Sequence, residues 1–114
     1  MKYNLVLARL TIWTFKKGKR EEGFAELDKI LNSATRHTKG FRGYVSLISQ
    51  DDPDTSTILT LWQDKETLDA SEKGVYSLAI AKVQDFLEGS PQVKNFKVFS
   101  TELFTRPELE EMFY

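Results

Sequence analysis

Cysteine is absent from this sequence of 114 residues, and histidine occurs once, at position 37. Without cysteine the chain forms no disulfide, thiolate–zinc site, iron–sulfur cluster or thiol nucleophile. A single histidine excludes a multi-histidine metal site and leaves no base placed to activate a serine in a hydrolase triad. We expect His37, near the end of a helix, to interact with the helix dipole. The sequence therefore predicts no metal site and identifies no catalytic residue.

The sequence also has little net charge and no long apolar run. Its 16 basic and 17 acidic residues give a formal net charge of −1, which is not the positive charge that drives phosphate binding. No stretch approaches the roughly 20 apolar residues of a membrane span. The apolar run near the N-terminus carries Arg9 and Thr11 and has no small-residue cleavage site, so it reads as a strand and not as a signal peptide. We expect no nucleic-acid partner, no membrane partner and a cytoplasmic location.

What the sequence does contain is a hydrophobic pattern that predicts two strand–helix–strand halves. Strands are expected over residues 4–15, 41–50, 56–63 and 93–104. Helices are expected over 19–38 and from an Asp64 N-cap to Gly89, the second being interrupted near Lys73 and Gly74. This order predicts an α+β, ferredoxin-like domain, β-α-β-β-α-β, with a four-stranded antiparallel sheet and both helices on one face. The domain spans 1–104, and 105–114 forms a C-terminal tail that could pack on a dimer.

The first strand is apolar on both of its faces, although a sheet face open to water should alternate to polar residues. We assign Leu5, Leu7 and Trp13 to the face away from the helices. An uncovered apolar face usually marks an interface, and a second copy of the same sheet related by a two-fold axis would cover it. The alternative is that the tail, 105–114, folds back over this face. The sequence therefore predicts a homodimer.

Arg9 lies in the middle of the same strand, on the face assigned to the dimer. A buried arginine needs carboxylate or carbonyl partners, and Glu102 on the fourth strand is one candidate. We expect a structural ion pair here and not a catalytic group.

Aromatic side chains indicate where a ligand would bind. Trp62 ends the third strand and shares its face with Ile58 and Thr60, while Tyr76 follows the helix break at Gly74. Together they could line a cavity between the sheet and the second helix, since apolar walls with a few polar donors are typical of small-molecule pockets. The alternative is that Trp62 and Tyr76 are ordinary core aromatics with their polar ends at the rim.

Four segments, in this order, resemble the antibiotic biosynthesis monooxygenase domain: residues 7–11, 17–18, 39–44 and 58–64. The resemblance covers about residues 4–104. It implies a dimeric α/β barrel with a pocket between sheet and helices in each subunit. Some members of the family are cofactor-free oxygenases of quinols and polyketide aromatics, in which a phenol bound as its anion reacts directly with dioxygen. The resemblance therefore implies a small aromatic substrate, dioxygen and no cofactor.

The sequence departs from the family pattern at several expected site positions. The haem-degrading branch has an asparagine, a tryptophan and a histidine that fall, by register, at Ala8, Ser71 and Ala81. In the quinol and polyketide branches an asparagine often stands four residues before the strand-end tryptophan, here Ile58, and a histidine near position 71. Trp62 is retained. Haem degradation is thus the least favoured reading.

The resulting hypothesis is a cofactor-free monooxygenase acting on a small aromatic or quinol-like substrate. The alternative is a non-catalytic ligand-binding or interaction domain on the same fold. The residues expected to form the pocket are Trp62, Tyr76, Ile58, Ser71 and Ala8.

Overall fold

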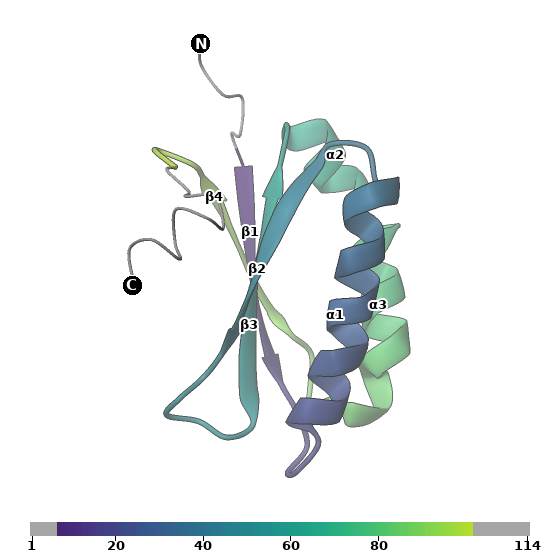
Figure 1. Ribbon diagram of the computed structural model, residues 1–114, viewed down its shortest axis with the longest axis vertical. Coiled ribbons are helices and arrows are strands. Elements are labelled where there is room, and N and C mark those ends of the chain that lie inside the picture. Colours follow the sequence, from purple (N-terminus) through teal and green to yellow (C-terminus); the bar gives the residue numbers. More distant parts are fainter. Residues whose placement is uncertain (1–6, 102–114) are drawn as a thin grey trace, which may run out of the picture.

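The computed structural model describes residues 7–101 as a four-stranded antiparallel sheet covered by helices on one face (Figure 1). The strands are β1 (Leu7–Thr14), β2 (Phe41–Ile48), β3 (Thr55–Trp62) and β4 (Gln92–Lys97). The helices are α1 (Arg20–His37), α2 (Lys65–Ala70), α3 (Val75–Val83) and the short 3-10 turn η1 (Gln84–Phe86). The strand order is β2-β3-β1-β4 and each neighbouring pair is antiparallel, which confirms the predicted ferredoxin-like α+β fold.

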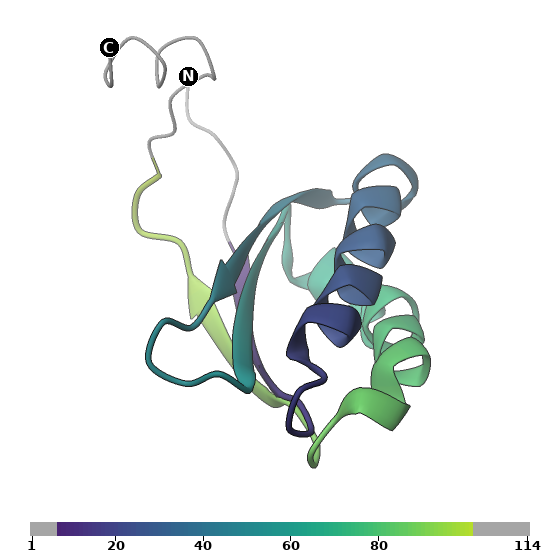
Figure 2. The same cartoon turned by 60° about the horizontal axis from the view of Figure 1, so that its bottom comes forward.

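Both long helices, α1 and α3, lie side by side on the same face of the curved sheet (Figure 2). The buried stripe of α1 includes Leu27, Leu31 and Ala34, which recur at helical spacing and face the sheet. Its first turn carries Glu21 and Glu22, where carboxylates complement the positive end of the helix dipole. No described element covers the opposite face of the sheet. Within residues 7–101, no helix is both long and apolar enough to cross a membrane.

A tight corner joins the end of α1 to β2 and fixes the start of α2. Gly40 has φ +79°, and a Cβ placed there would lie 2.4 Å from Cγ2 of Thr67, so glycine is required for both backbone and space. Asp64 is the predicted N-cap, and its carboxylate accepts a hydrogen bond from the Thr67 backbone N–H at 2.9 Å. This corner therefore sets where α2 begins.

The predicted helix break is confirmed, since α2 ends at Ala70 and α3 begins at Val75. Ser71 holds the turn together, because its carbonyl accepts hydrogen bonds from the N–H groups of Gly74 at 3.1 Å and Tyr76 at 2.9 Å. Ser71 itself is buried against the sheet. The break thus brings Ser71 and the first turn of α3 over the centre of the sheet.

The predicted fourth strand was too long. The structure ends β4 at Lys97, and its ladder with β1 runs to the pair Leu7↔Lys97. Residues 102–114, which include the proposed tail, and residues 1–6 lie outside the described part of the chain.

The assignment of the two faces of β1 was wrong. Arg9, Thr11 and Trp13 are buried and face the helices, and Trp13 packs in the core with Leu27 and Leu31. Leu7 also packs against this core, so neither it nor Trp13 belongs to an interface on the open side. Because β1 is apolar on both faces, alternation alone could not say which face the helices cover; the polar residues Arg9 and Thr11 misleadingly suggested the open one.

The open face of the sheet is nevertheless strongly apolar. Strand pairing and alternation place eight apolar residues on it: Ala8, Leu10, Ile12, Val45, Leu47, Leu59, Leu61 and Phe96. Several are exposed, Leu47 and Phe96 at 47% each. The expected uncovered apolar face therefore exists, but β1 contributes Ala8, Leu10 and Ile12 to it, and not Leu7 and Trp13.

Candidate functional site

A small cavity lies between the sheet and the helices, directly below the break between α2 and α3. About 40 Å³ of it is open to the centre of a water-sized sphere, which is room for a few water molecules. Its apolar wall consists of Trp13, Leu27, Leu31, Ile58, Trp62, Val75 and Ala79. Its polar residues are Arg9, Thr11, Thr60, Ser71 and Tyr76. An apolar enclosure with a few convergent polar groups is the usual form of a small-molecule site.

The structure brings four of the five expected pocket residues together around this cavity. Trp62 and Ile58 reach it from β3, Ser71 from the helix break and Tyr76 from α3. Ala8 is not among the lining residues, because it stands on the open face between Leu61 and Phe96 on the neighbouring strands.

Ala81, the second position transferred from the haem-degrading branch that does not line the cavity, lies on α3. Ala81 is exposed on α3, whereas Ala79 and Val83 are the buried residues of that helix. Of the three transferred positions, only Ser71 lines the cavity.

Trp62 is fixed by its neighbours and keeps no free donor for a ligand. Its indole Nε1–H donates to Oγ1 of Thr60 at 2.9 Å, and the Thr60 hydroxyl donates on to the Arg9 carbonyl at 3.4 Å. The indole ring lies 4.9 Å from the ring of Phe41, between centroids, and is 2% exposed. The Trp62 N–H is therefore not available to a ligand, and Trp62 contributes an apolar wall to the cavity.

Arg9 lines the cavity in a setting that the sequence did not predict. Its side chain is buried and makes three hydrogen bonds: from Nε to Oδ1 of Asn95 at 3.1 Å, from Nη1 to Oγ of Ser71 at 3.2 Å, and from Nη2 to Oε1 of Glu72 at 3.2 Å. Its expected partner, Glu102, lies outside the described residues. Arg9 thus connects the centre of the sheet to β4 and to the helix break.

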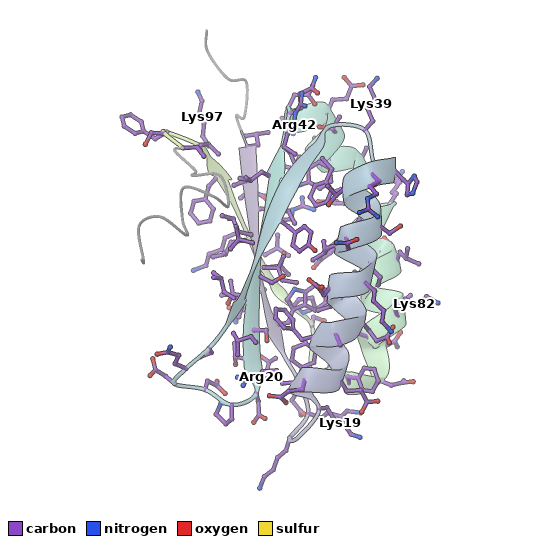
Figure 3. All side chains as sticks on the ribbon, in the orientation of Figure 1. Lys19, Arg20, Lys39, Arg42, Lys82 and Lys97 are labelled. Atoms are coloured by element: carbon purple, nitrogen blue, oxygen red, sulfur yellow. The ribbon has the colours of Figure 1, made fainter. Side chains whose placement is uncertain are left out.

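The charge of Arg9 is only partly compensated. Among the described residues, Glu72 is its one carboxylate partner, and the Glu72 side chain is 65% exposed while that of Arg9 is 4% exposed. A guanidinium has five N–H donors, so Nη1 and Nη2 each keep one N–H without an acceptor among residues 7–101. The basic side chains labelled in Figure 3, which do not include Arg9, are spread over the ends and sides of the molecule. Arg9 is the cation that the cavity encloses.

Tyr76 lies beside Arg9 at the cavity. The Arg9 guanidinium carbon is 5.6 Å from the centroid of the Tyr76 ring, within the range of a cation–π contact. Burial raises the pKa of the Tyr76 phenol above its usual value, the charge of Arg9 lowers it, and Glu72 raises it. At neutral pH Tyr76 is therefore a neutral phenol that can donate a hydrogen bond, and it does not act as a base.

Trp13 places an unpaired donor in the same region. Trp13 is 2% exposed, and its Nε1–H has no acceptor among residues 7–101. Its ring is 6.2 Å from that of Tyr76, so Tyr76 contacts both Arg9 and Trp13. A buried donor without a partner is costly and uncommon, which makes Trp13 a candidate ligand contact.

A surface groove runs outside the cavity. Ser71 and Val75 line both the groove and the cavity, so they form the wall between them. His37, at the end of α1, lies on the groove and not in the cavity. Across the described part of the chain, no three His, Cys, Asp or Glu residues gather closely enough to hold a metal ion.

Chemically, this arrangement suits an oxyanion. A buried guanidinium with spare N–H groups, in a site walled by apolar side chains, attracts negative charge more strongly than the same group does in water.

Comparison with known proteins agrees with the architecture. The sequence model of the antibiotic biosynthesis monooxygenase family matches residues 6–83. No curated protein matches the sequence significantly.

Several solved structures share the fold at low sequence identity. A candidate antibiotic biosynthesis monooxygenase from Nitrosomonas europaea is 16% identical, with a TM-score of 0.73 over 83% of this chain and 91% of the other. Another from Bacteroides thetaiotaomicron is 14% identical, with a TM-score of 0.72 over 92% and 100%. A mutant of SnoaB, a cofactor-independent oxygenase from Streptomyces nogalater, is 11% identical, with a TM-score of 0.70 over 85% and 96%. At these identities the similarity shows a common fold.

Proposed function

This chain belongs to the antibiotic biosynthesis monooxygenase family, and from that premise we propose that it is a cofactor-free monooxygenase of a small aromatic or quinol-like molecule. The observation that carries the proposal is the buried Arg9 guanidinium in a largely apolar cavity. Oxygenation without a cofactor requires an electron-rich substrate, and a phenol becomes electron-rich when it loses its proton. A fixed cation favours that anion.

In the proposed reaction a hydroquinone and dioxygen give a hydroxyquinone and water. One oxygen atom forms a bond to a ring carbon, the other leaves as water, and the substrate supplies all the electrons. Arg9 has no lone pair with which to take the phenolic proton, so that proton passes to solvent and Arg9 stabilises the anion that remains. Trp62 and Ile58 serve as walls that orient the ring and exclude water.

Ser71 and Tyr76 act beside Arg9 in this proposal. The Ser71 hydroxyl accepts from Arg9 and donates to the Leu68 carbonyl at 2.5 Å, so it fixes the position of the guanidinium. Tyr76, a neutral phenol, can donate a hydrogen bond to a substrate or product oxygen. Both are thus positioning or binding groups.

The second candidate function is ligand binding without catalysis. Ile58 and Ser71 stand where family members often carry asparagine and histidine, and both line the cavity. The cavity would then hold a small aromatic with no reaction. Haem degradation is the weakest candidate, since neither α2 nor α3 contains a histidine to ligate iron.

Oxygen uptake with a panel of hydroquinones, in the absence of added cofactor or metal, separates these functions. The proposal expects uptake above the autoxidation rate with at least one hydroquinone, and a loss of that increment in Arg9→Gln, which removes the charge. Binding of hydroquinones with no uptake by any of them would favour the non-catalytic alternative. Loss of the absorbance of added haem on supplying a reductant would favour the third.

We also propose that the chain works as a homodimer whose two sheets face one another. The support is the apolar open face, from Ala8 and Leu10 on β1 to Leu47 on β2 and Phe96 on β4. A second copy would bury these side chains, and a specific interface should exceed about 1,000 Å² in total. The cytoplasmic location expected from the sequence remains a prediction.

A further inference from the structure

We infer that the cavity selects an aromatic monoanion with a second oxygen function remote from the charged one, and that this ligand displaces the Glu72 carboxylate from Arg9. The inference rests on the proposed function for the location of the site. It concerns binding alone and does not require that the bound molecule react.

The three partners of Arg9 differ in how easily they can leave. Ser71 is buried and itself hydrogen-bonded to the Leu68 carbonyl, so it is a fixed partner. Glu72 is 65% exposed at its side chain and reaches Arg9 with one oxygen from the turn between α2 and α3. An ion pair with one exposed partner is weak, because water competes for the carboxylate.

The Glu72 carboxylate can move without disturbing the turn. Its backbone carbonyl is held by the Ser77 hydroxyl, and its backbone N–H donates to the Asp69 carbonyl at 3.2 Å. Rotation of the side chain into solvent breaks neither contact. It would free an Nη2 N–H of Arg9, which with the N–H groups already spare gives a ligand oxygen several donors.

One cation sets the charge of the ligand. Among residues 7–101, Arg9 is the one Lys, Arg or His side chain that lines the cavity, so a second negative charge there would have no counterpart in this part of the chain. A dianion would pay a desolvation cost that nothing offsets. A monoanion that replaces Glu72 leaves the local charge balance unchanged.

The unpaired Trp13 N–H supplies the second requirement. This N–H is buried. The Trp13 ring and the Arg9 guanidinium both contact the ring of Tyr76, so the two donors lie in the same part of the cavity. Arg9 and Trp13 lie four residues apart on one face of β1, which separates their Cα atoms by about 13 Å at the usual strand rise. A flat ring with an oxygen at each end is larger than the about 40 Å³ now open in the cavity, so in this inference the lining side chains shift to admit it, and its two oxygens then meet the two donors.

The test uses three probes under anaerobic conditions, with affinity measured by titration calorimetry. The probes are 4-hydroxybenzoate, its neutral amide 4-hydroxybenzamide, and benzoate, which lacks the second oxygen. We expect 4-hydroxybenzoate to bind about tenfold more tightly than the amide, the size of one charge-assisted contact. Benzoate should bind several-fold more weakly than 4-hydroxybenzoate.

Glu72→Gln is the decisive variant. It removes a competing anion from an exposed position, so it should tighten 4-hydroxybenzoate binding several-fold while leaving the amide unchanged. Glu88→Gln makes the same charge change at an exposed carboxylate that does not bond Arg9, and should alter neither affinity. Trp13→Phe should remove the advantage of 4-hydroxybenzoate over benzoate.

Equal affinity for the acid and its amide, or weaker acid binding in Glu72→Gln than in the parent, would overturn the inference. Failure of all three probes to bind would do the same. These outcomes are distinct from failure of the proposed function, which would appear as probe binding with the expected preferences but no oxygen uptake with any hydroquinone. Arg9→Lys, which keeps the charge, should retain part of the preference for the acid.

Discussion

At the residue scale, the two buried tryptophans differ in whether the indole N–H has a hydrogen-bond acceptor. Both are 2% exposed and both line the cavity. The Trp62 indole N–H is satisfied by Thr60, whereas that of Trp13 has no acceptor among the described residues. Their substitution by phenylalanine should therefore have unequal costs.

We predict that Trp62→Phe lowers the free energy of unfolding by about 1 kcal/mol more than Trp13→Phe, the typical net value of one hydrogen bond. Both substitutions remove a similar side-chain volume, so the difference between their losses in unfolding free energy reports the hydrogen bond of the indole N–H. Urea denaturation of the ligand-free protein measures it. A larger loss in Trp13→Phe would mean that the Trp13 N–H has a partner of its own.

The raised pKa of Tyr76 gives a prediction about alkaline pH. The folded protein holds the phenolic proton more tightly than the unfolded chain, whose tyrosine pKa is near 10.0. Stability is therefore unaffected by Tyr76 below pH 10 and falls as pH rises above it, because the unfolded state alone releases the proton. Chemical denaturation across alkaline pH should show a shallower fall in Tyr76→Phe than in the parent, and parallel curves would refute the assignment.

At the scale of the element, helix α1 depends on close packing at a glycine. A Cβ on Gly23 would lie 2.5 Å from Cε1 of Phe15 and 3.2 Å from Cβ of Phe86. Phe15 is 1% exposed, so its ring has little room to move. Gly23 lets α1 approach the end of β1 and η1.

We predict that Gly23→Ala destabilises the protein by about 1 kcal/mol, because overpacking outweighs the gain in helix propensity. Ala25→Gly, at an exposed position of the same helix, is the matched control and should also destabilise, by about 1 kcal/mol through propensity. Thermal unfolding compares the two. If Gly23→Ala is stabilising, helix propensity controls this position and the contact with Phe15 is loose.

Some features of the helices and strands could be predicted from the sequence, and others could not. The order of strands and helices, the Asp64 cap and the break before Val75 were predictable because they rest on local signals: periodicity, a capping side chain and a glycine. The facing of β1 was not, because both of its faces are apolar and the choice depends on which one the helices cover. Because of that one error, Arg9 and Trp13 were assigned to the open face although they line the cavity, as Trp62 and Tyr76 also do.

At the scale of the whole molecule, the uncovered face of the sheet bears on assembly. It carries Val45 and Leu47 on β2 and Phe96 on β4, all at least two-fifths exposed. Ile48 is also exposed but points to the helix side of the same strand, where it pairs with Ser56. The adjacent residues Leu47 and Ile48 therefore lie on opposite faces of the sheet.

We predict that the protein sediments as a dimer at micromolar concentration and that Leu47→Glu shifts it toward monomer. The physical reason is that a carboxylate buried between two sheets has no partner. Ile48→Glu changes the neighbouring residue identically on the other face and should remain dimeric. Monomeric behaviour of the unsubstituted protein, or an equal effect of both changes, would argue against the sheet-to-sheet dimer.

The central claim is that the Arg9 cavity oxygenates a small aromatic without a cofactor. The most direct measurement is mass spectrometry of the product formed from a hydroquinone under ¹⁸O₂, with no cofactor, metal or reductant added. The account predicts a hydroxyquinone carrying one ¹⁸O atom, formed faster than in the protein-free control and with that excess largely lost in Arg9→Gln, which removes the charge. Product at the protein-free rate for every hydroquinone tried, or label incorporation that Arg9→Gln leaves unchanged, would contradict it.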